Sequence, residues 1–169
     1  MQVALTGTPG VGKTTVAAAL SARGGISVHE LETVTVAEQY RAGTDAERET
    51  VIADLDGLRG WATGRDGVIV SHLAHLLGPD RAIVLRCHPE ELADRLTDER
   101  RSPASIAENS EAEALDVILT EAVAALGAAA VAEVDTTGRS PGAVADAVEA
   151  LLTEPWCPSA GTVDFTEVL

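Results

Sequence analysis

The chain has 169 residues, a length that fits one domain. Hydrophobic residues make up 46% of it and aromatic residues only 2%, so the core must be built from aliphatic side chains. With 12 basic and 27 acidic residues, the formal net charge is −15. The negative electrostatic potential of such a protein repels nucleic acid and anionic membranes. We therefore expect no direct DNA binding and no membrane-surface role.

Almost all of the basic residues are arginine, because Lys13 is the single lysine of the chain. A surface rich in acid and poor in lysine is typical of proteins that work in very high salt, where screening weakens self-repulsion. An ordinary acidic soluble protein is the alternative. No apolar run approaches the roughly 18 residues of a membrane span, and the start of the chain resembles a strand rather than a basic signal peptide. We expect a halophilic, cytoplasmic protein.

Short apolar runs alternate with longer, alanine-rich segments along the chain. Strands are expected at residues 3–6, 26–28, 68–70, 82–85 and 130–134. Helices are expected at residues 13–22, 34–40, 46–58, 89–96, 104–126 and 141–152, with one apolar turn of helix through 73–77. Continuous apolar strands between helices predict an α/β fold with a five-stranded parallel sheet flanked by helices on both faces.

Residues 7–14 read Gly-Thr-Pro-Gly-Val-Gly-Lys-Thr, a full match to the phosphate-binding pattern GxxxxGK[ST]. The glycines permit backbone angles that place successive N–H groups around an anion, and the following helix directs its positive end at the same anion. Lys13 adds a full charge for the β- and γ-phosphates, Thr14 offers a hydroxyl to magnesium, and Thr15 can reach the α-phosphate. The nucleotide-binding residues predicted here are Gly10, Val11, Gly12, Lys13, Thr14 and Thr15.

A chance glycine-rich turn is the alternative to a phosphate loop. In a chain of this size a chance match to the pattern occurs with a frequency on the order of one in a hundred or less. A buried strand precedes the motif and a helix follows it, as phosphate binding requires. Since lysine is missing everywhere else, Lys13 is not there for solubility. The motif predicts a P-loop NTPase fold of three layers that binds ATP.

The phosphate loop and three further stretches together resemble the archaeal-type adenylate kinases. The loop alone is shared by many families, whereas the four stretches in this order are specific, and they span residues 1 to about 150. They are Leu5–Thr15, His72–Leu77 leading into Val84–Cys87, Glu108–Glu113 leading into Leu115 and Asp116, and Glu133–Gly138. The eukaryotic relatives of this family include a nuclear adenylate kinase and ATPase that acts in assembly of the small ribosomal subunit.

The resemblance implies a nucleoside monophosphate kinase-like protein that converts ATP and AMP into two ADP with magnesium and hydrolyses ATP more slowly. It implies one kinase domain over residues 1–154, with a monophosphate-binding insertion at 30–53 and a lid at 98–108. A C-terminal tail follows at 155–169. Phosphoryl transfer needs positioning and neutralisation of charge rather than covalent chemistry from the protein. Cationic side chains are therefore the main candidates for the remaining site residues.

Arg41 and Arg48 are the only cations of the monophosphate-binding insertion. Either could hold the AMP phosphate, since arginine binds phosphate in a bidentate way. A solvated helix face is the alternative for each. Thr136 follows the last strand, where the family has its adenine-binding loop, and a plain glycine turn is the alternative there.

The lid must bring positive charge over the transferring phosphate. Here the sequence departs from the family, which has an Arg-Gly pair where this chain has Glu99-Arg100. Arg100 and Arg101 could act instead if the loop is shifted by one residue. Arg95, one turn earlier, matches the family without a shift. We expect Arg95 and Arg100 to be catalytic.

His72 matches the histidine of an acid-x-His motif in the family, but the acid position is occupied by Val70. Magnesium is then expected to be held by Thr14, the phosphates and water, with His72 orienting a water molecule nearby. A histidine satisfied at the edge of the sheet is the alternative.

Three functions stay open at this point. The first is a kinase of AMP or another nucleoside monophosphate. The second is an ATPase assembly factor that docks on a small-subunit ribosomal protein, for which an acidic surface suits a basic partner. The third is a kinase of another small metabolite, because the fold alone does not decide the substrate.

Overall fold

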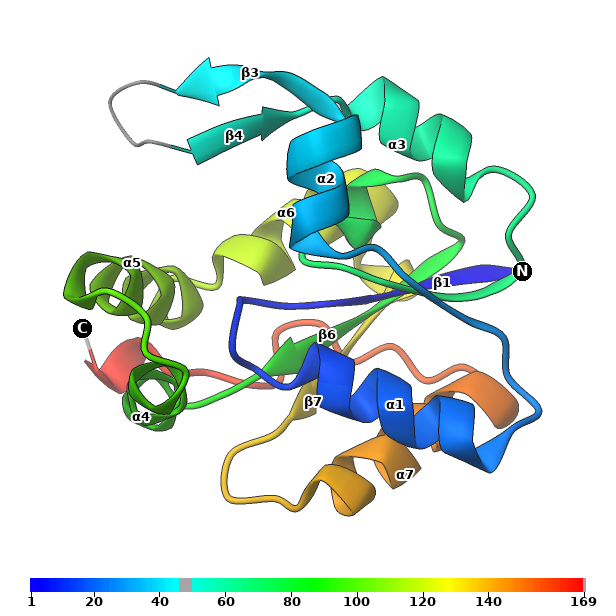
Figure 1. Ribbon diagram of the computed structural model, residues 1–169. Coiled ribbons are helices and arrows are strands. Elements are labelled where there is room, and N and C mark those ends of the chain that lie inside the picture. The colour runs from blue at the N-terminus through cyan, green and yellow to red at the C-terminus, as the bar shows by residue number, and fades with distance from the viewer. Residues whose placement is uncertain (46–49, 169) are drawn as a thin grey trace.

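A parallel sheet of five strands forms the middle of the molecule (Figure 1). The computed structural model describes residues 1–45 and 50–168. In the order of their pairing the strands are β2 (Val28–Glu30), β5 (Gly67–Val70), β1 (Gln2–Thr6), β6 (Arg81–Arg86) and β7 (Val131–Asp135). The predicted five-stranded parallel sheet is confirmed, with β1 and the loop that follows it at the centre.

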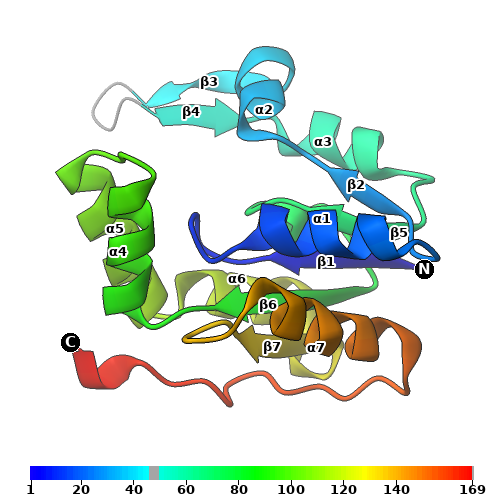
Figure 2. The same cartoon turned by 60° about the horizontal axis from the view of Figure 1, so that its bottom comes forward.

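Helices cover both faces of this sheet and make three layers (Figures 1 and 2). Along β1, Val3 and Leu5 pack on one face and Ala4 on the other, because successive side chains of a strand point to opposite sides. The first face is covered by α1 (Lys13–Arg23), α4 (Pro89–Asp98) and α7 (Pro141–Thr153). The second is covered by α2 (Thr33–Gln39), α3 (Leu55–Ala62), the short η1 (Ala74–Leu76) and α6 (Val117–Leu126). Among the described residues no helix has the length and apolar character needed to cross a bilayer.

A two-stranded antiparallel hairpin stands outside the main sheet and corrects one prediction. The sequence predicted a helix over 46–58, but β3 (Arg41–Asp45) pairs with β4 (Thr50–Ala53), and α3 begins only at Leu55. Three consecutive β-branched residues, 50–52, explain the strand, since such side chains fit an extended backbone better than a helix. The hairpin, with α2 and α3, lies on one side of the phosphate loop, while α4 and α5 (Pro103–Ala114) lie on another (Figure 2).

The long helix predicted over 104–126 is also wrong, because it is broken into α5 and α6 at Leu115 and Asp116. Asp116 adopts the left-handed conformation, with φ of 55°, and its carboxylate pairs with the guanidinium of Arg86. Arg86 also donates to the main-chain oxygen of Glu113, at 3.2 Å. A buried guanidinium must find acceptors for its N–H groups. The break supplies two of them, which an unbroken helix would not present together.

The C-terminal tail runs along the outer edge of β7 (Figure 2). The amide of Ser159 donates to the carbonyl of Val131 at 3.1 Å, and the indole of Trp156 donates to the carbonyl of Ala129 at 2.9 Å. The tail ends in the single turn η3 (Thr166–Val168), while a second single turn, η2 (Ala128–Ala130), precedes β7. The tail thus provides hydrogen-bond partners for part of the edge strand β7, whose backbone groups would otherwise be unpaired.

Candidate nucleotide-binding site

The loop between β1 and α1 has the geometry of an anion cradle. Gly7 has φ of 139°, and a Cβ there would lie 2.5 Å from the carbonyl oxygen of Leu85. Gly12, with φ of 103°, precedes the first turn of α1, and no side chain caps that turn. The free N–H groups at the start of α1 therefore face outward with the positive end of the helix dipole. Only glycine suits either position.

Lys13 lies over this loop and holds it together. Its ammonium group donates to the carbonyl oxygens of Gly7, at 2.7 Å, and Thr8, at 2.9 Å. Burial lowers the pKa of Lys13 to about 8, and the negative charges of Glu113 and Glu99 offset part of that shift. Lys13 is still mostly charged near pH 7, and a bound phosphate would favour the charged form further.

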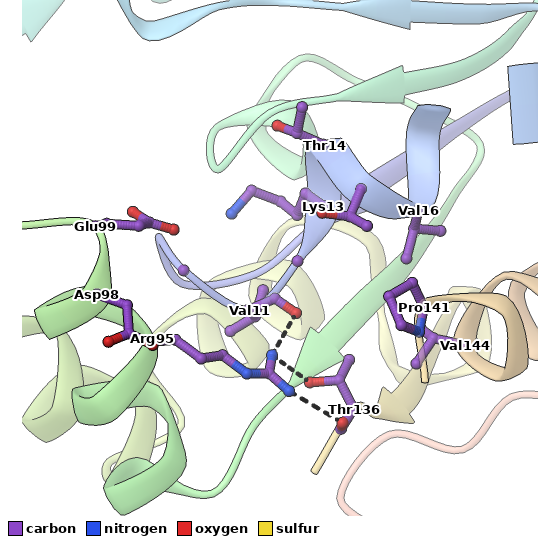
Figure 3. A pocket seen from close by; sticks show the side chains of 13 residues that line it. Val11, Lys13, Thr14, Val16, Arg95, Asp98, Glu99, Thr136, Pro141 and Val144 are labelled. Atoms are coloured by element: carbon purple, nitrogen blue, oxygen red, sulfur yellow. Dashed lines mark hydrogen bonds between the residues drawn. The ribbon is translucent and has the colours of Figure 1, made fainter. Parts of the chain in front are cut away.

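Two cavities meet at this lysine. The first, of about 510 Å³, lies between the phosphate loop, α1, α4 and the start of α7 (Figure 3). The second, of about 380 Å³, lies between the phosphate loop and the ends of β2 and β5. Gly10, Lys13, Thr14 and Glu99 line both. The structure thus places the same ammonium and the same threonine hydroxyl between two separate spaces.

Arg95 of α4 anchors the far wall of the first cavity. Its guanidinium donates to the carbonyl of Val11 and to the hydroxyl and carbonyl of Thr136, each at 3.2 Å (Figure 3). It also pairs with Glu91 one turn earlier on α4, at 2.5 Å. The hydroxyl of Thr136 itself donates to the carbonyl of Arg86 at 2.8 Å. Arg95 therefore connects the phosphate loop to the loop after β7, and both predicted residues lie at one cavity.

The second cavity is lined by charges of both signs. His72 lies there at the end of β5, and Arg101 enters from the loop between α4 and α5. Burial, followed by the positive charges of Lys13 and His75, lowers the pKa of His72 to about 4, so its ring is neutral near pH 7. The acidic residues of this wall are Glu30, Glu32 and Glu99.

The other predicted arginines lie elsewhere. Arg100 is exposed and left-handed, with φ of 59°, and within residues 1–45 and 50–168 it lines neither cavity. Arg41 is exposed on β3 and hydrogen bonds to the hydroxyl of Thr44. Arg48 lies outside the described residues. The structure therefore brings Lys13, Thr14, Arg95, Thr136 and His72 together, and does not bring Arg41 or Arg100 to them.

A cluster beneath the phosphate loop was missed in the sequence. Arg86 is 1% exposed and pairs with Glu113, at 2.7 Å, with Glu133, at 2.6 Å, and with Asp116. Glu113 also accepts a hydrogen bond from the hydroxyl of Thr8 in the loop. An arginine that directly follows a run of core residues was the one available signal, but its partners lie about 30 to 50 positions away in the sequence.

Comparison with other proteins agrees with this geometry. A family model described as an AAA domain matches residues 3–116. A protein of Natronomonas pharaonis named "Putative adenylate kinase" is 48% identical over 170 residues, covering 100% of both chains. A protein of the same name from Halobacterium salinarum is 50% identical over 169 residues, covering 99% of both chains.

Solved structures share the fold at lower identity. A sugar kinase from Janibacter superposes with a TM-score of 0.52 and 20% identity, over 89% of this chain and 93% of its own. A gluconokinase from Sinorhizobium meliloti superposes with a TM-score of 0.54 and 18% identity, over 90% of this chain and 93% of its own. These likenesses concern the three-layer P-loop architecture alone. The full-length relatives, at 48% and 50% identity, show that the chain belongs to the archaeal adenylate kinase family.

Proposed function

We propose that the protein is an adenylate kinase, a phosphotransferase that moves the γ-phosphate of ATP to AMP and yields two ADP. The observation that carries this proposal is the pair of cavities that meet at Lys13. A donor and an acceptor nucleotide can each lie beside one ammonium group, and such juxtaposition supplies much of the rate of a phosphoryl transfer. The name of the full-length relatives supports the same reaction.

ATP is assigned to the first cavity. The amides of Gly10 to Thr15 and the Lys13 ammonium would surround its phosphates, while Arg95 is close enough to contribute positive charge. Val16, Pro141 and Val144 give this cavity an apolar wall beside Thr136. The adenine base would rest on that wall, which agrees with the assignment of the loop after β7 to base binding.

The monophosphate is assigned to the second cavity, which opens toward the proposed monophosphate-binding insertion at 30–53. Arg101 lines this cavity and is the lid arginine best placed to meet a phosphate, while Arg100 is the alternative within the proposed lid at 98–108. His72, neutral at pH 7, can orient a water molecule by donating or accepting a hydrogen bond. Arg41 and Arg48 stay candidates for binding the phosphate of AMP.

Magnesium fits oxygen donors that line the second cavity. Mg²⁺ prefers oxygen ligands and is held by one or two carboxylates, water and substrate phosphates. Thr14 supplies a hydroxyl, and Glu30 supplies a carboxylate on the strand beside Val70, since residues 30 and 70 are partners in the β2–β5 register. Glu30 can replace the acid that position 70 lacks. When bound, the ion neutralises charge on the β- and γ-phosphates.

The two alternatives are less well supported. Nothing in the names of the relatives points to a ribosomal partner, and the acidic surface that suits one is equally explained by adaptation to salt. The sugar kinase and gluconokinase share the fold only, at 20% identity or less, so they do not indicate the substrate.

A steady-state assay in high salt with ATP and magnesium tests the proposal. AMP, other nucleoside monophosphates or no acceptor are supplied in turn, and ADP formation is measured. We expect AMP to give the largest increase. If no monophosphate raises ADP formation above the rate with ATP alone, the kinase assignment fails and the ATPase alternative stands.

A further inference from the structure

Glu113 is a buried carboxylate beneath the phosphate loop that lines neither nucleotide cavity. It lies in the last turn of α5 and is 3% exposed. One carboxylate oxygen accepts from the hydroxyl of Thr8, and the other accepts from Arg86 at 2.7 Å and from the amide of Cys87 at 3.1 Å. A single side chain therefore connects the phosphate loop, the end of β6 and α5.

The loop residue that Glu113 holds is central to the shape of the loop. Thr8 is 1% exposed, so its hydroxyl has no access to water as an alternative partner. Its carbonyl accepts hydrogen bonds from the Lys13 ammonium at 2.9 Å and from the amide of Val11 at 3.3 Å. The position of the Thr8 peptide therefore determines where the lysine and the turn of the loop lie.

Glu113 is itself held rigidly. Arg86 donates to its carboxylate and to its main-chain oxygen, and the same guanidinium is fixed by Glu133 and Asp116. The ring of Phe165 from the tail lies 5.4 Å from the guanidinium carbon of Arg86. Buried ion pairs contribute little net stability, because desolvation offsets their attraction. The cluster is better explained by the geometry it imposes than by the free energy of folding.

We propose that Glu113 is a positioning residue for ATP binding, which holds Thr8 so that the phosphate loop keeps its anion-binding shape. Glu113 lines neither cavity and acts on the shape of the loop through the hydroxyl of Thr8. The inference rests on the proposed function, because it assigns ATP to the first cavity. It gives a role to the Glu108–Glu113 stretch, which the reaction itself leaves unexplained.

The test removes the hydrogen bond and keeps the shape. Thr8→Val has nearly the same volume and deletes the donor, while the ion pairs of Arg86 stay in place. We expect the dissociation constant of ATP, measured by titration calorimetry, to rise about tenfold, as for loss of one hydrogen bond to a charged group. The dissociation constant of AMP should change less than about twofold. Thr8→Ser keeps the donor and should recover most of the lost ATP affinity.

Glu133→Gln is the matched control on the opposite side of Arg86. Glu133 accepts from Arg86 and from the amide of Thr162 in the tail, at 2.8 Å, but does not contact the loop. This variant should lower the melting temperature and change the dissociation constant of ATP much less than Thr8→Val does, because Arg86 keeps its bonds to Glu113. A purely structural role for the cluster predicts instead that ATP affinity falls in proportion to melting temperature in both variants, and that result would overturn the inference.

Equal ATP affinity in wild type and Thr8→Val would also overturn it. Failure of the proposed function gives a different result. A wild-type protein that binds ATP but phosphorylates no monophosphate would contradict the kinase assignment, while the ATP affinities of wild type and Thr8→Val could still be compared. A wild type that binds no ATP would sink both proposals.

Discussion

The two cavities at the phosphate loop differ in how their walls are made. The first is bounded by the loop backbone, three helices and the anchored guanidinium of Arg95, with an apolar side. The second is bounded by strand ends and by a connecting loop, and carries the carboxylates of Glu30, Glu32 and Glu99 beside Lys13 and Arg101. The first cavity is lined mainly by backbone and apolar side chains, whereas the second carries more carboxylates, although Glu99 lines both.

The difference indicates how a protein of net charge −15 can bind polyanions. In the first cavity, main-chain amides and a helix terminus supply positive potential in addition to the charges of Lys13 and Arg95. In the second, a few cations must outweigh nearby carboxylates, so magnesium and the proposed lid at 98–108 would matter more. Substitutions that affect one cavity and not the other therefore test this division directly.

The largest effect is expected at Lys13, which both cavities share. Lys13→Ala should reduce turnover at least about a thousandfold, the scale on which a cation at a transferring phosphoryl group acts. ADP formation measures this, and circular dichroism checks that the fold is intact. Turnover within threefold of wild type would refute the assigned role.

Arg100 and Arg101, the two arginines of the proposed lid, test the difference between the cavities next. Arg101 lines the second cavity, so Arg101→Ala should raise the KM for AMP by tenfold to a hundredfold, as expected for a lost charge-assisted phosphate contact. The KM for ATP should change little. The sequence favoured Arg100, and Arg100→Ala is the matched comparison. If kcat falls more in Arg100→Ala than in Arg101→Ala, the proposed lid rearranges when substrates bind.

The carboxylate proposed for magnesium is tested without relying on turnover. Glu30→Gln should raise the concentration of Mg²⁺ needed for half-maximal strengthening of ATP binding by about tenfold or more, because loss of even an outer partner of a metal lowers metal affinity by about that factor. Glu32→Gln, in the same cavity, is the control. The double variant Glu30→Gln with Val70→Asp should return the Mg²⁺ requirement to the wild-type level. Equal Mg²⁺ requirements in all four proteins would rule out the role of Glu30.

The smallest effect is a pH dependence. In the free enzyme, burial lowers the pKa of Lys13 to about 8, so the ammonium loses its proton as the pH rises through that value. The kcat/KM for ATP, which reports the free enzyme, should fall about fourfold between pH 7 and 8.5. His72 does not contribute, because its pKa of about 4 keeps it neutral over this range. A flat profile to pH 9.5 would contradict the assignment to Lys13.

The lowered pKa of Lys13 affects the free energy of folding in the opposite direction to activity, because stability rises as the lysine loses its proton. Because the folded-state pKa of Lys13 lies below its unfolded value of 10.5, the charged lysine costs folding free energy below pH 8. That cost is relieved as the pH rises from about 8 toward 10.5. An alkaline loss of activity from Lys13 should therefore occur without a loss of folding stability from the same residue.

Local sequence patterns predicted most of the fold. Each strand of the main sheet was located to within about two residues. Four of the five are short, mostly apolar runs, in which burial leaves a strong signal, whereas β2 includes His29 and Glu30 and is only partly buried. The hairpin was missed because its strands are short and largely exposed, so acidic residues there resembled a helix. The interruption at Asp116 was missed because its cause, Arg86, lies 30 residues away.

The phosphate loop and the family were determined by the sequence alone. Gly7, Gly12 and Lys13 lie within one short segment, and their backbone and charge requirements act locally. Tertiary structure alone decided which residues share a cavity with that segment, and it brought Arg101 rather than Arg100 to the second cavity. It also placed Glu113 beneath Thr8 across 105 positions of sequence. Such long-range contacts depend on how strands and helices pack, and no local pattern encodes them.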